Sequence, residues 1–215
     1  MLRVLEPIVP ADPPRPGADA VAERAAHPMR AVTRQVAFEP GGWTGERRAK
    51  VAALFDGLAP EWHTHLADPQ RTVPLADAYE RGAIPGGGTC LEVGSGDGAN
   101  TAFLAERHDA VIALDLSIEM LRRATGDRVR ADSGAAPLRT GAVDVVVLVN
   151  ALLFPDETDR VLAPGGTVVW VNTAGDLTPI HLAAEEVEEA LPGAWDGLAS
   201  EAGWGSWSVW RRLSP

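Results

Sequence analysis

Hydrophobic positions along the chain alternate between two periods from about residue 89 onward. Short apolar runs typical of buried strands are separated by segments in which apolar residues recur at helical spacing. These patterns predict strands over residues 89–93, 110–115, 128–131, 145–149 and 167–171, and helices over 99–107, 118–124 and 182–190. Such alternation favours a parallel sheet with right-handed crossover connections. The run at 145–149 is apolar throughout, as expected of a central strand covered on both faces.

The part of the chain before residue 89 has helical patterns only. A helix is predicted over residues 44–58, where a threonine at the start can act as the N-cap and apolar side chains recur at helical spacing. Further helical segments are predicted over 61–66 and 72–81. Residues 1–43 are rich in proline and alanine and have no sustained period, so we expect a partly ordered extension, with a short helix over 20–26.

The C-terminal end of the chain changes to a strand–turn–strand pattern. Residues 195–200 and 207–212 predict two strands joined by a glycine-containing turn, which we interpret as an antiparallel hairpin that closes the sheet. The predicted fold class is therefore α/β: a doubly wound, mostly parallel seven-stranded sheet with a C-terminal antiparallel hairpin and a helical N-terminal extension. The predicted organisation is an extension over 1–43 followed by one domain over 44–215.

Charge and composition narrow the range of partners. The chain has 215 residues and a formal net charge of −11, so its electrostatic field repels nucleic acid and anionic lipid surfaces. We therefore expect neither a nucleic-acid nor a membrane partner. Cys90 is the only cysteine and lies in an apolar strand, which rules out a disulfide framework and fits a reducing, cytoplasmic setting. We also expect neither a signal peptide nor a membrane anchor, because prolines break the start of the chain.

The segment from Cys90 to Asn100 predicts a buried strand that breaks into a glycine-rich turn and continues into a helix. Glycines at 94, 96 and 98 let the backbone turn tightly and approach a ligand, and the helix offers unpaired N–H groups and a positive dipole end. This layout is typical of a nucleotide-type cofactor site. The spacing of Gly94, Gly96 and Ala99 also satisfies the relaxed dinucleotide fingerprint, so the glycines alone leave the cofactor open.

Three polar side chains are predicted at the same edge of the sheet. Asp115 ends the second strand roughly 20 residues after the turn, where a carboxylate can accept both hydrogen bonds of a ribose diol. Glu92 precedes the turn, and its partly buried carboxylate needs hydrogen bonds from loop N–H groups or, through water, from a cofactor ammonium group. Asn150 follows the strand at 145–149 and is a candidate for contact with a bound ligand, although helix capping is equally natural there.

Five segments in order carry a resemblance to a known family: 91–98, 112–121, 130–133, 143–147 and 160–166. They resemble the motifs of the class I, Rossmann-like S-adenosylmethionine-dependent methyltransferases, and within these the small-molecule branch that includes the quinone-biosynthesis C-methyltransferases. The resemblance extends from about residue 54 to residue 213. It implies S-adenosyl-L-methionine as the cofactor and methyl transfer to a small-molecule acceptor by in-line displacement at the sulfonium methyl.

The resemblance also implies roles for individual residues. Asp115 would hold the ribose hydroxyls, and Asp132 with the adjoining backbone would lie beside the adenine amine. The cofactor-binding residues implied are Glu92, Gly94, Ser95, Gly96, Gly98, Asp115, Leu116, Met120, Asp132, Ser133 and Asn150. No catalytic base is assigned, because alignment of the acceptor supplies most of the acceleration and a base is needed only for a protonated, weakly acidic acceptor.

In this family the helices before the first strand form one wall of the acceptor pocket. The resemblance therefore makes Trp62, His63 and His65, with the neighbouring Glu61, candidates for acceptor binding or proton removal. His181, beyond the fifth strand, is a further candidate. His63 and His65 lie on different helix faces with no other nearby histidine or cysteine, so no metal site is expected. The acceptor, its reacting atom and the oligomeric state stay open.

Two alternatives to an active methyltransferase also stay open. An NAD(P)-dependent oxidoreductase would share the fold, but Glu92 stands where dinucleotide enzymes usually have an apolar residue. In addition, Lys50 and Tyr79, the only lysine and tyrosine, precede the turn and cannot form a downstream Tyr-x-x-x-Lys pair. A catalytically inactive binding module with the methyltransferase fold is the second alternative, favoured by the short connection over 150–160 and the lack of a long substrate cap.

Other conspicuous side chains have structural interpretations. We expect His27 and His108 on the surface, and the acidic helix at 185–189 to present a solvated face. Aromatic side chains in the terminal hairpin are expected in the core or at an oligomer contact; they are Trp195, Trp204, Trp207 and Trp210.

Overall fold

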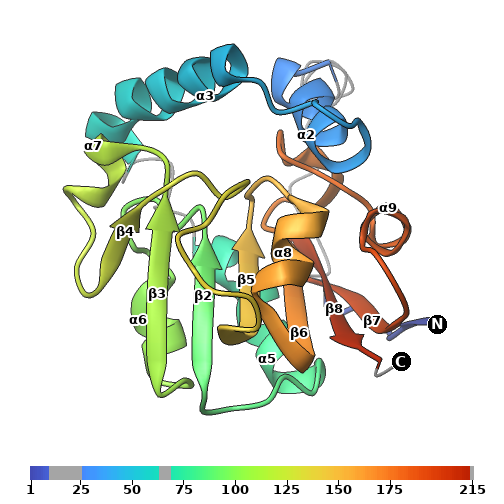
Figure 1. The fold of residues 1–215 in the computed structure, drawn as a ribbon. Coiled ribbons are helices and arrows are strands. Elements are labelled where there is room, and N and C mark those ends of the chain that lie inside the picture. The colour runs from blue at the N-terminus through green and yellow to red at the C-terminus, as the bar shows by residue number, and fades with distance from the viewer. Residues whose placement is uncertain (10–25, 63–68, 214–215) are drawn as a thin grey trace.

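The computed structural model describes residues 1–9, 26–62 and 69–213. Its eight-stranded sheet has the strand order β1-β7-β8-β6-β5-β2-β3-β4 (Figure 1). The strands are β1 (Leu2–Val4), β2 (Thr89–Val93), β3 (Ala110–Asp115), β4 (Arg128–Arg130), β5 (Val143–Val149), β6 (Leu162–Asn172), β7 (Trp195–Ala202) and β8 (Gly205–Arg212). The helices are α2 (Pro28–Phe38), α3 (Gly45–Leu58), α5 (Val73–Arg81), α6 (Thr101–Ala105), α7 (Ile118–Leu121), α8 (Pro155–Val161) and α9 (Ala184–Ala190), with short 3-10 turns η1 (Ala59–Glu61), η2 (Pro69–Thr72) and η3 (Gly175–Leu177).

The order of the strands reverses between β2 and β5. The chain runs from β2 outward to β3 and β4 and then returns to β5 on the other side of β2, and all these neighbours pair in parallel. β6 continues the parallel part, whereas β8 is antiparallel to both β6 and β7. The predicted doubly wound, mostly parallel sheet with a C-terminal hairpin is confirmed. In such a sheet the ligand crevice lies at the carboxyl ends of the strands, where the order reverses.

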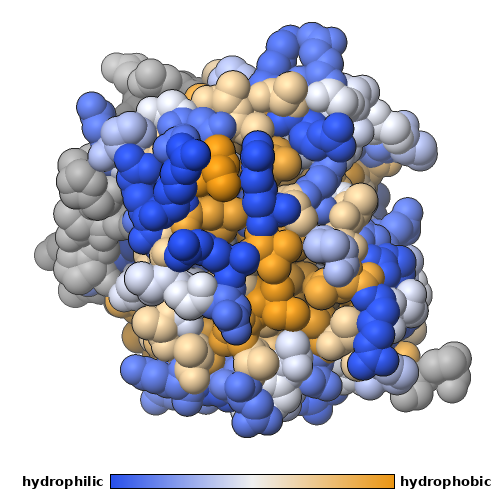
Figure 2. Space-filling model, turned by 60° about the vertical axis from the view of Figure 1, so that its left-hand side comes forward, coloured by the Kyte–Doolittle hydropathy of each residue, from blue (hydrophilic) through white to orange (hydrophobic). Residues whose placement is uncertain are grey.

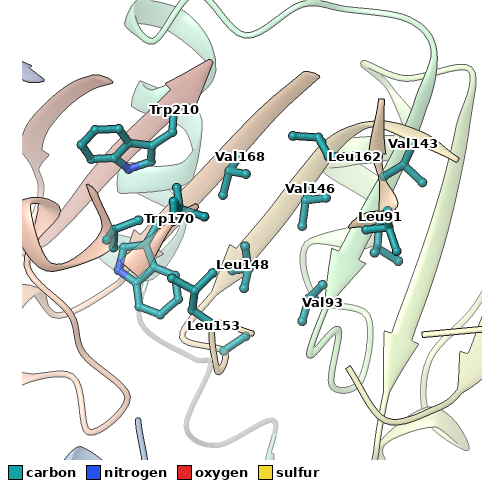
Figure 3. Packing of buried hydrophobic residues seen from close by; sticks show 14 of the residues in the cluster. Leu91, Val93, Val143, Val146, Leu148, Leu153, Leu162, Val168, Trp170 and Trp210 are labelled. Atoms are coloured by element: carbon teal, nitrogen blue, oxygen red, sulfur yellow. The ribbon is translucent and has the colours of Figure 1, made fainter. Parts of the chain in front are cut away.

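The central strand β5 separates two hydrophobic layers. Val145, Val146, Val147 and Leu148 are fully buried, and successive side chains on a strand point to opposite faces. Val146 and Leu148 belong to the layer beneath α8 and α9, together with Trp210 of β8 (Figure 3). Val145 and Val147 belong to the layer beneath α5 and α6. Burial on both faces explains why this strand is apolar throughout.

Helices α2 and α3, which we call the roof, cross the carboxyl-end edge of the sheet (Figure 1). Met29 and Val51 of the roof form a separate cluster with Ile180, which follows β6. Leu116 and Leu152, which follow β3 and β5, pack against the same cluster. The roof therefore covers the edge at which the crevice of this fold is expected.

Helix α2 is absent from the sequence prediction. Its buried residues Met29, Thr33 and Val36 follow helical spacing, but the middle one is polar and interrupts the apolar pattern. The Thr33 hydroxyl donates to the Met29 carbonyl oxygen at 2.7 Å, so its burial leaves no unsatisfied group. His27, which is exposed as expected, caps the helix through its Nδ1, 3.2 Å from the Met29 nitrogen. The helix predicted over 20–26 lies outside the described residues.

Strand β1 adds an eighth strand to the seven that the sequence predicts. It pairs in parallel with β7, with Leu2 opposite Gly197. The Met1 amino group donates to the Trp195 carbonyl oxygen at 2.8 Å. The strand is three residues long and Val4 is exposed, so the sequence carries no alternating pattern there. Only the edge of β7, far along the chain, makes this segment a strand.

The two helix starts predicted from capping residues, those of α3 and α7, agree with the structure. Thr44 caps α3 by accepting from the Arg47 nitrogen at 3.2 Å, and Ser117 caps α7 by accepting from the Met120 nitrogen at 3.1 Å. Helices α6 and α7 are shorter than the predicted 99–107 and 118–124, and α9 begins at Ala184 rather than at residue 182. Local capping thus marks where these helices begin, whereas tertiary packing sets their length.

The expectation of a surface position for His108 is wrong. This histidine is 6% exposed, with Nε2 at 2.7 Å from the Tyr79 hydroxyl and Nδ1 at 2.8 Å from the Gly87 carbonyl oxygen. Since a carbonyl only accepts, Nδ1 carries the proton and the tyrosine donates to Nε2. The His108 ring is buried by its contact with Tyr79 of α5, and nothing in the sequence around His108 predicts that contact. The hairpin tryptophans do lie in the core as expected: Trp195, Trp207 and Trp210 are buried, and Trp204 is partly buried.

The surface is mixed in character. Figure 2 shows one face on which charged and polar side chains surround a strip of apolar ones. Apolar side chains in part exposed to water are ordinary on folded proteins. Within the described ranges, none of the helices combines the length and the hydropathy that a membrane crossing requires.

Candidate functional site

The glycine-rich turn after β2 exposes bare backbone at the crevice. Gly94 and Gly96 have φ angles of 66° and 58°, a conformation that side chains disfavour. A Cβ added to Gly94 would lie 2.9 Å from the Ala151 Cβ, so this position also lacks room for a side chain. Among the described residues, a Cβ on Gly96 would have only the Trp62 Nε1, 3.6 Å away, within contact distance. Gly94 is thus exposed but has no room for a side chain, whereas Gly96 is partly buried and leaves space where a side chain would be.

Asp115, at the end of β3, is fixed by this turn. One carboxylate oxygen accepts from the Gly96 nitrogen at 2.8 Å, and the other accepts from the Ser117 nitrogen at 2.7 Å. Burial raises the pKa of Asp115, and these backbone hydrogen bonds only partly offset the effect. Each carboxylate oxygen retains a further acceptor position. The arrangement presents a rigid pair of acceptors next to the open backbone.

Glu92 lies beneath the turn and is 1% exposed. Its Oε2 accepts from the Thr101 hydroxyl at 2.6 Å, a partner that was not among the two alternatives considered from the sequence. Burial raises the pKa of Glu92 to about 7, and the nearby charges of Asp115 and Asp97 act in the same direction. The Glu92 Oε1 and the Ser95 hydroxyl are buried without a hydrogen-bond partner in the described part of the chain. Two polar atoms beside the turn thus lack the partners that buried groups normally have.

Asp132, after β4, connects the crevice to the roof. Its two oxygens lie 2.9 and 3.1 Å from the Trp43 indole nitrogen, and Oδ2 also accepts from Arg48 at 3.0 Å. The Gly134 nitrogen donates to Oδ1 at 2.9 Å. The Trp43 ring packs edge-on against Phe154, with ring centroids 5.2 Å apart. Sequence reasoning missed both Trp43 and Arg48, because these contacts join residues more than 80 positions apart.

Asp56 of α3 holds the roof to the other side of the crevice. One of its oxygens accepts from the Ser117 hydroxyl at 2.5 Å and from the Glu119 nitrogen at 3.1 Å, so it adds a second cap to α7. The hydrogen bond from Ser117 keeps the pKa of Asp56 below its usual value. Sequence reasoning missed this residue as well, since an aspartate within a helix gives no sign of its distant partner.

Asn150 joins the loops that follow β5 and β6. Its Oδ1 accepts from the Thr173 nitrogen at 2.9 Å, and its Nδ2 donates to the Thr173 hydroxyl at 2.8 Å. The residue has a φ of 51°, one of the uncommon positive values among non-glycine residues. Both groups of the amide are therefore engaged in holding two crevice loops together.

The remaining predicted cofactor residues differ in exposure. Met120 is 1% exposed, and Leu116 lies partly buried against the roof. Ser133 contributes to the lining of a small cavity together with Leu114 and Phe154. These side chains surround the carboxyl ends of β3 and β4 rather than projecting into solvent.

The two described candidates for acceptor binding, Trp62 and His181, have different neighbours. Trp62 lies near the glycine turn and packs edge-on against Phe55 of the roof at 5.9 Å between centroids. His63 and His65 lie outside the described residues. His181 follows β6 and contacts Arg30 of α2. Among the described residues, the structure contains no cluster of three or more histidine, cysteine or acidic side chains that could hold a metal ion.

The fold is that of an α/β protein, and its glycine turn and fixed carboxylate have the arrangement that is typical of a nucleotide-type cofactor site. The family model of the methyltransferase domain matches residues 91–170. Demethylmenaquinone methyltransferase of Renibacterium salmoninarum is 31% identical over 169 residues, which cover 68% of this chain and 69% of that protein. The chain therefore belongs to the S-adenosylmethionine-dependent methyltransferases, and S-adenosylmethionine is the cofactor of this family.

Two further comparisons add detail. The 23S rRNA (guanine(748)-N(1))-methyltransferase of Streptomyces fradiae is 37% identical over 129 residues, which cover 56% of this chain and 44% of that protein. The chain thus spans less than half the length of this relative. Among solved structures, the DhpI–SAH complex aligns with a TM-score of 0.59 at 22% identity, over 76% of this chain and 95% of that one. This structural similarity supports the fold class.

Proposed function

We propose that this methyltransferase methylates a small molecule and that its cofactor binds between the glycine turn and Asp115. The Asp115 carboxylate is the observation that carries the proposal. Backbone N–H groups from Gly96 and Ser117 fix both of its oxygens, so their remaining acceptor positions are set for the two hydroxyls of a ribose.

The described residues also suit the other polar groups of S-adenosylmethionine. Its methionine part carries an ammonium and a carboxylate group. The unpaired Glu92 Oε1 would accept from the ammonium group, directly or through water, and the unpaired Ser95 hydroxyl would donate to the carboxylate. The open backbone at Gly96 allows close approach of the ligand. The two unsatisfied buried atoms thereby gain partners.

The chemistry of the transfer rests on alignment. When bound, the cofactor supplies a methyl group activated by a cationic sulfonium. The glycine turn and Asp115 would fix the donor, and the roof would exclude water and hold the acceptor in line with the carbon–sulfur bond. We assign no proton transfer to a residue, because the need for a base depends on the acceptor.

A small-molecule acceptor is favoured over RNA by charge. A net charge of −11 opposes approach of a phosphate backbone, and a relative that covers two thirds of this chain is named as a demethylmenaquinone methyltransferase. RNA methylation is the second candidate, on the ground of the rRNA methyltransferase relative. Methyl transfer from labelled cofactor to a panel of phenols, quinones, amines and carboxylates, with a 23S rRNA transcript alongside, decides between them. Transfer only to the transcript would contradict the proposal, and transfer to nothing would support the inactive binding module.

Replacing Asp115 by alanine should weaken binding of S-adenosylhomocysteine by about 1.5–3 kcal/mol, the usual range for hydrogen bonds to a charged group. Isothermal titration calorimetry measures the affinity. Asp109→Ala is a matched control, because the Asp109 carboxylate also accepts from a backbone nitrogen, that of Gly88 at 2.8 Å, but precedes β3 instead of ending it. Equal affinities in the wild type and Asp115→Ala would remove the ribose assignment. NAD serves as a ligand that the wild type should not bind.

Replacing Trp43 by phenylalanine should strengthen S-adenosylhomocysteine binding about fivefold, since one hydrogen bond is worth about 1 kcal/mol. The Trp43 and Arg48 donors and the Gly134 nitrogen occupy the acceptor positions of Asp132, so an adenine amine must displace one of them. Phenylalanine keeps the ring packing but removes the N–H donor. Trp195→Phe is the control, because its indole donates to the Pro192 carbonyl oxygen away from the roof. Unchanged or weaker binding in Trp43→Phe would show that Asp132 only anchors the roof.

A further inference from the structure

Arg30 and Arg34 lie one turn apart on α2 but have different partners. Arg34 forms an ion pair with Glu186 of α9. Arg30 instead contacts the imidazole of His181, with 3.3 Å between its terminal nitrogen and Nδ1. Among the described residues, no carboxylate forms an ion pair with Arg30, and its Nε is buried without a hydrogen-bond partner. Within the part of the chain that the structure describes, this half-buried cation therefore has no counterion.

The contact with Arg30 fixes the protonation of His181. A guanidinium group only donates, so Nδ1 must accept and the single ring proton lies on Nε2. Burial lowers the pKa of His181 and the charge of Arg30 lowers it further, while Asp176 acts in the opposite direction. The imidazole is therefore neutral near pH 7. Together the two side chains provide one positive charge and one additional neutral N–H donor.

The Arg30–His181 pair joins the roof to the segment that follows β6. The neighbouring Ile180 packs against Met29 and Val51 of the roof, and its carbonyl oxygen accepts from Asn172, the last residue of β6, at 2.9 Å. The proposed cofactor residues lie at the ends of β2 and β3, and β5 separates β2 from β6 in the sheet. The pair thus lies apart from the proposed cofactor residues along the same edge, in surroundings where an uncompensated charge is costly.

We propose that Arg30 and His181 form a subsite for a carboxylate group of the methyl acceptor. This inference rests on the proposed function and adds the class of substrate. One cation and one neutral donor match the charge and the two oxygens of a carboxylate. A phosphate dianion would keep an uncompensated negative charge in a chain whose net charge is already −11. The carboxylate would also satisfy the buried Arg30 Nε.

Acetate is the probe. Because it is small, its binding does not depend on the shape of the rest of the acceptor. The His181 ring resonances, identified by their loss in His181→Gln, are followed by heteronuclear NMR in protein saturated with S-adenosylhomocysteine. Acetate should shift them in a saturable manner, and acetamide, its neutral analogue, should not. Arg30→Gln should weaken acetate binding by about tenfold or more, the range for a hydrogen bond to a charged group. Arg34→Gln, one turn along the same helix, should bind acetate as the wild type does.

Three results would overturn the subsite. These are no response of His181 to acetate, equal responses to acetate and acetamide, and acetate binding that survives in Arg30→Gln. If inorganic phosphate binds more tightly than acetate, the subsite is specific for a phosphate group and not for a carboxylate. Loss of acetate binding in both arginine variants would show that the packing of α2 on the protein, and not the charge of Arg30 itself, controls acetate binding. Calorimetry with S-adenosylhomocysteine separates the two proposals: if it fails to bind the wild type, the proposed function fails, whereas binding without an acetate response removes only the subsite.

Discussion

Replacing Asp77 by alanine is expected to lower the free energy of unfolding by about 3–5 kcal/mol, the cost of removing one partner from a buried ion pair. The Asp77 side chain is 8% exposed and accepts two hydrogen bonds from Arg81, at 2.7 and 2.5 Å. Its Oδ2 also accepts from the Trp207 indole nitrogen at 2.6 Å. Alanine leaves the indole N–H without its acceptor. It also leaves the guanidinium without its counterion, although the Glu6 carbonyl oxygen and the Ser200 hydroxyl still accept from it. Urea unfolding followed by tryptophan fluorescence measures the change.

Asp196→Ala is the matched control for this experiment. Asp196 also pairs with an arginine, Arg3, but the two side chains are 43% and 60% exposed, so the loss should stay below about 1 kcal/mol. Burial raises the pKa of Asp77, yet the hydrogen bonds and the charge of Arg81 outweigh it and hold the pKa below the ordinary value. The stabilisation is thus present above that ordinary value and lost as the pH falls through the lowered one. Similar losses of unfolding free energy in Asp77→Ala and Asp196→Ala would mean that burial of the Asp77–Arg81 pair adds nothing to stability.

The strands around the crevice could be predicted because their signals are local. β5 is apolar throughout since helices cover both of its faces. The turn after β2 needs positive φ at Gly94 and Gly96, so its glycines are visible in the sequence. Asp115 follows from the same reasoning, because the end of a parallel strand fixes the position of the side chain. The predicted boundary between residues 43 and 44 stays a prediction.

The contacts of the roof could not be predicted, because neither residue of each contact stands out in its own stretch of sequence. Trp43 follows two glycines, and Asp132 follows a short strand, yet they meet across the crevice. Arg30 lies in a helix whose pattern is interrupted by the buried polar Thr33. His181 was a candidate from the resemblance, but nothing in the sequence pairs it with Arg30. Such contacts depend on how α2 and α3 cross the sheet, which periodicity does not specify.

Replacing Glu92 by glutamine is expected to abolish a loss of stability that the wild type undergoes as the pH rises from about 4.5 to about 7. Burial raises the pKa of this carboxyl from the ordinary value of 4.5 to about 7. Between these values the native state retains a proton that the unfolded chain has released, so the free energy of unfolding falls as the pH rises. At about 1.36 kcal/mol for each pKa unit, the loss is on the order of 3 kcal/mol.

The difference between wild type and Glu92→Gln isolates this group together with its interaction with Asp115, because other titrating residues such as His181 contribute to both curves. Glutamine keeps an oxygen for the Thr101 hydroxyl and stays neutral at every pH. Unfolding free energies from urea titrations at pH 5 and pH 8 should therefore diverge, with the variant more stable relative to the wild type at pH 8. Glu46→Gln removes an exposed carboxylate and should leave the pH dependence in this range nearly unchanged. Parallel curves of unfolding free energy against pH for wild type and Glu92→Gln would mean that Glu92 is ionised in the native state. Its unpaired Oε1 would then need a positively charged partner in the folded protein.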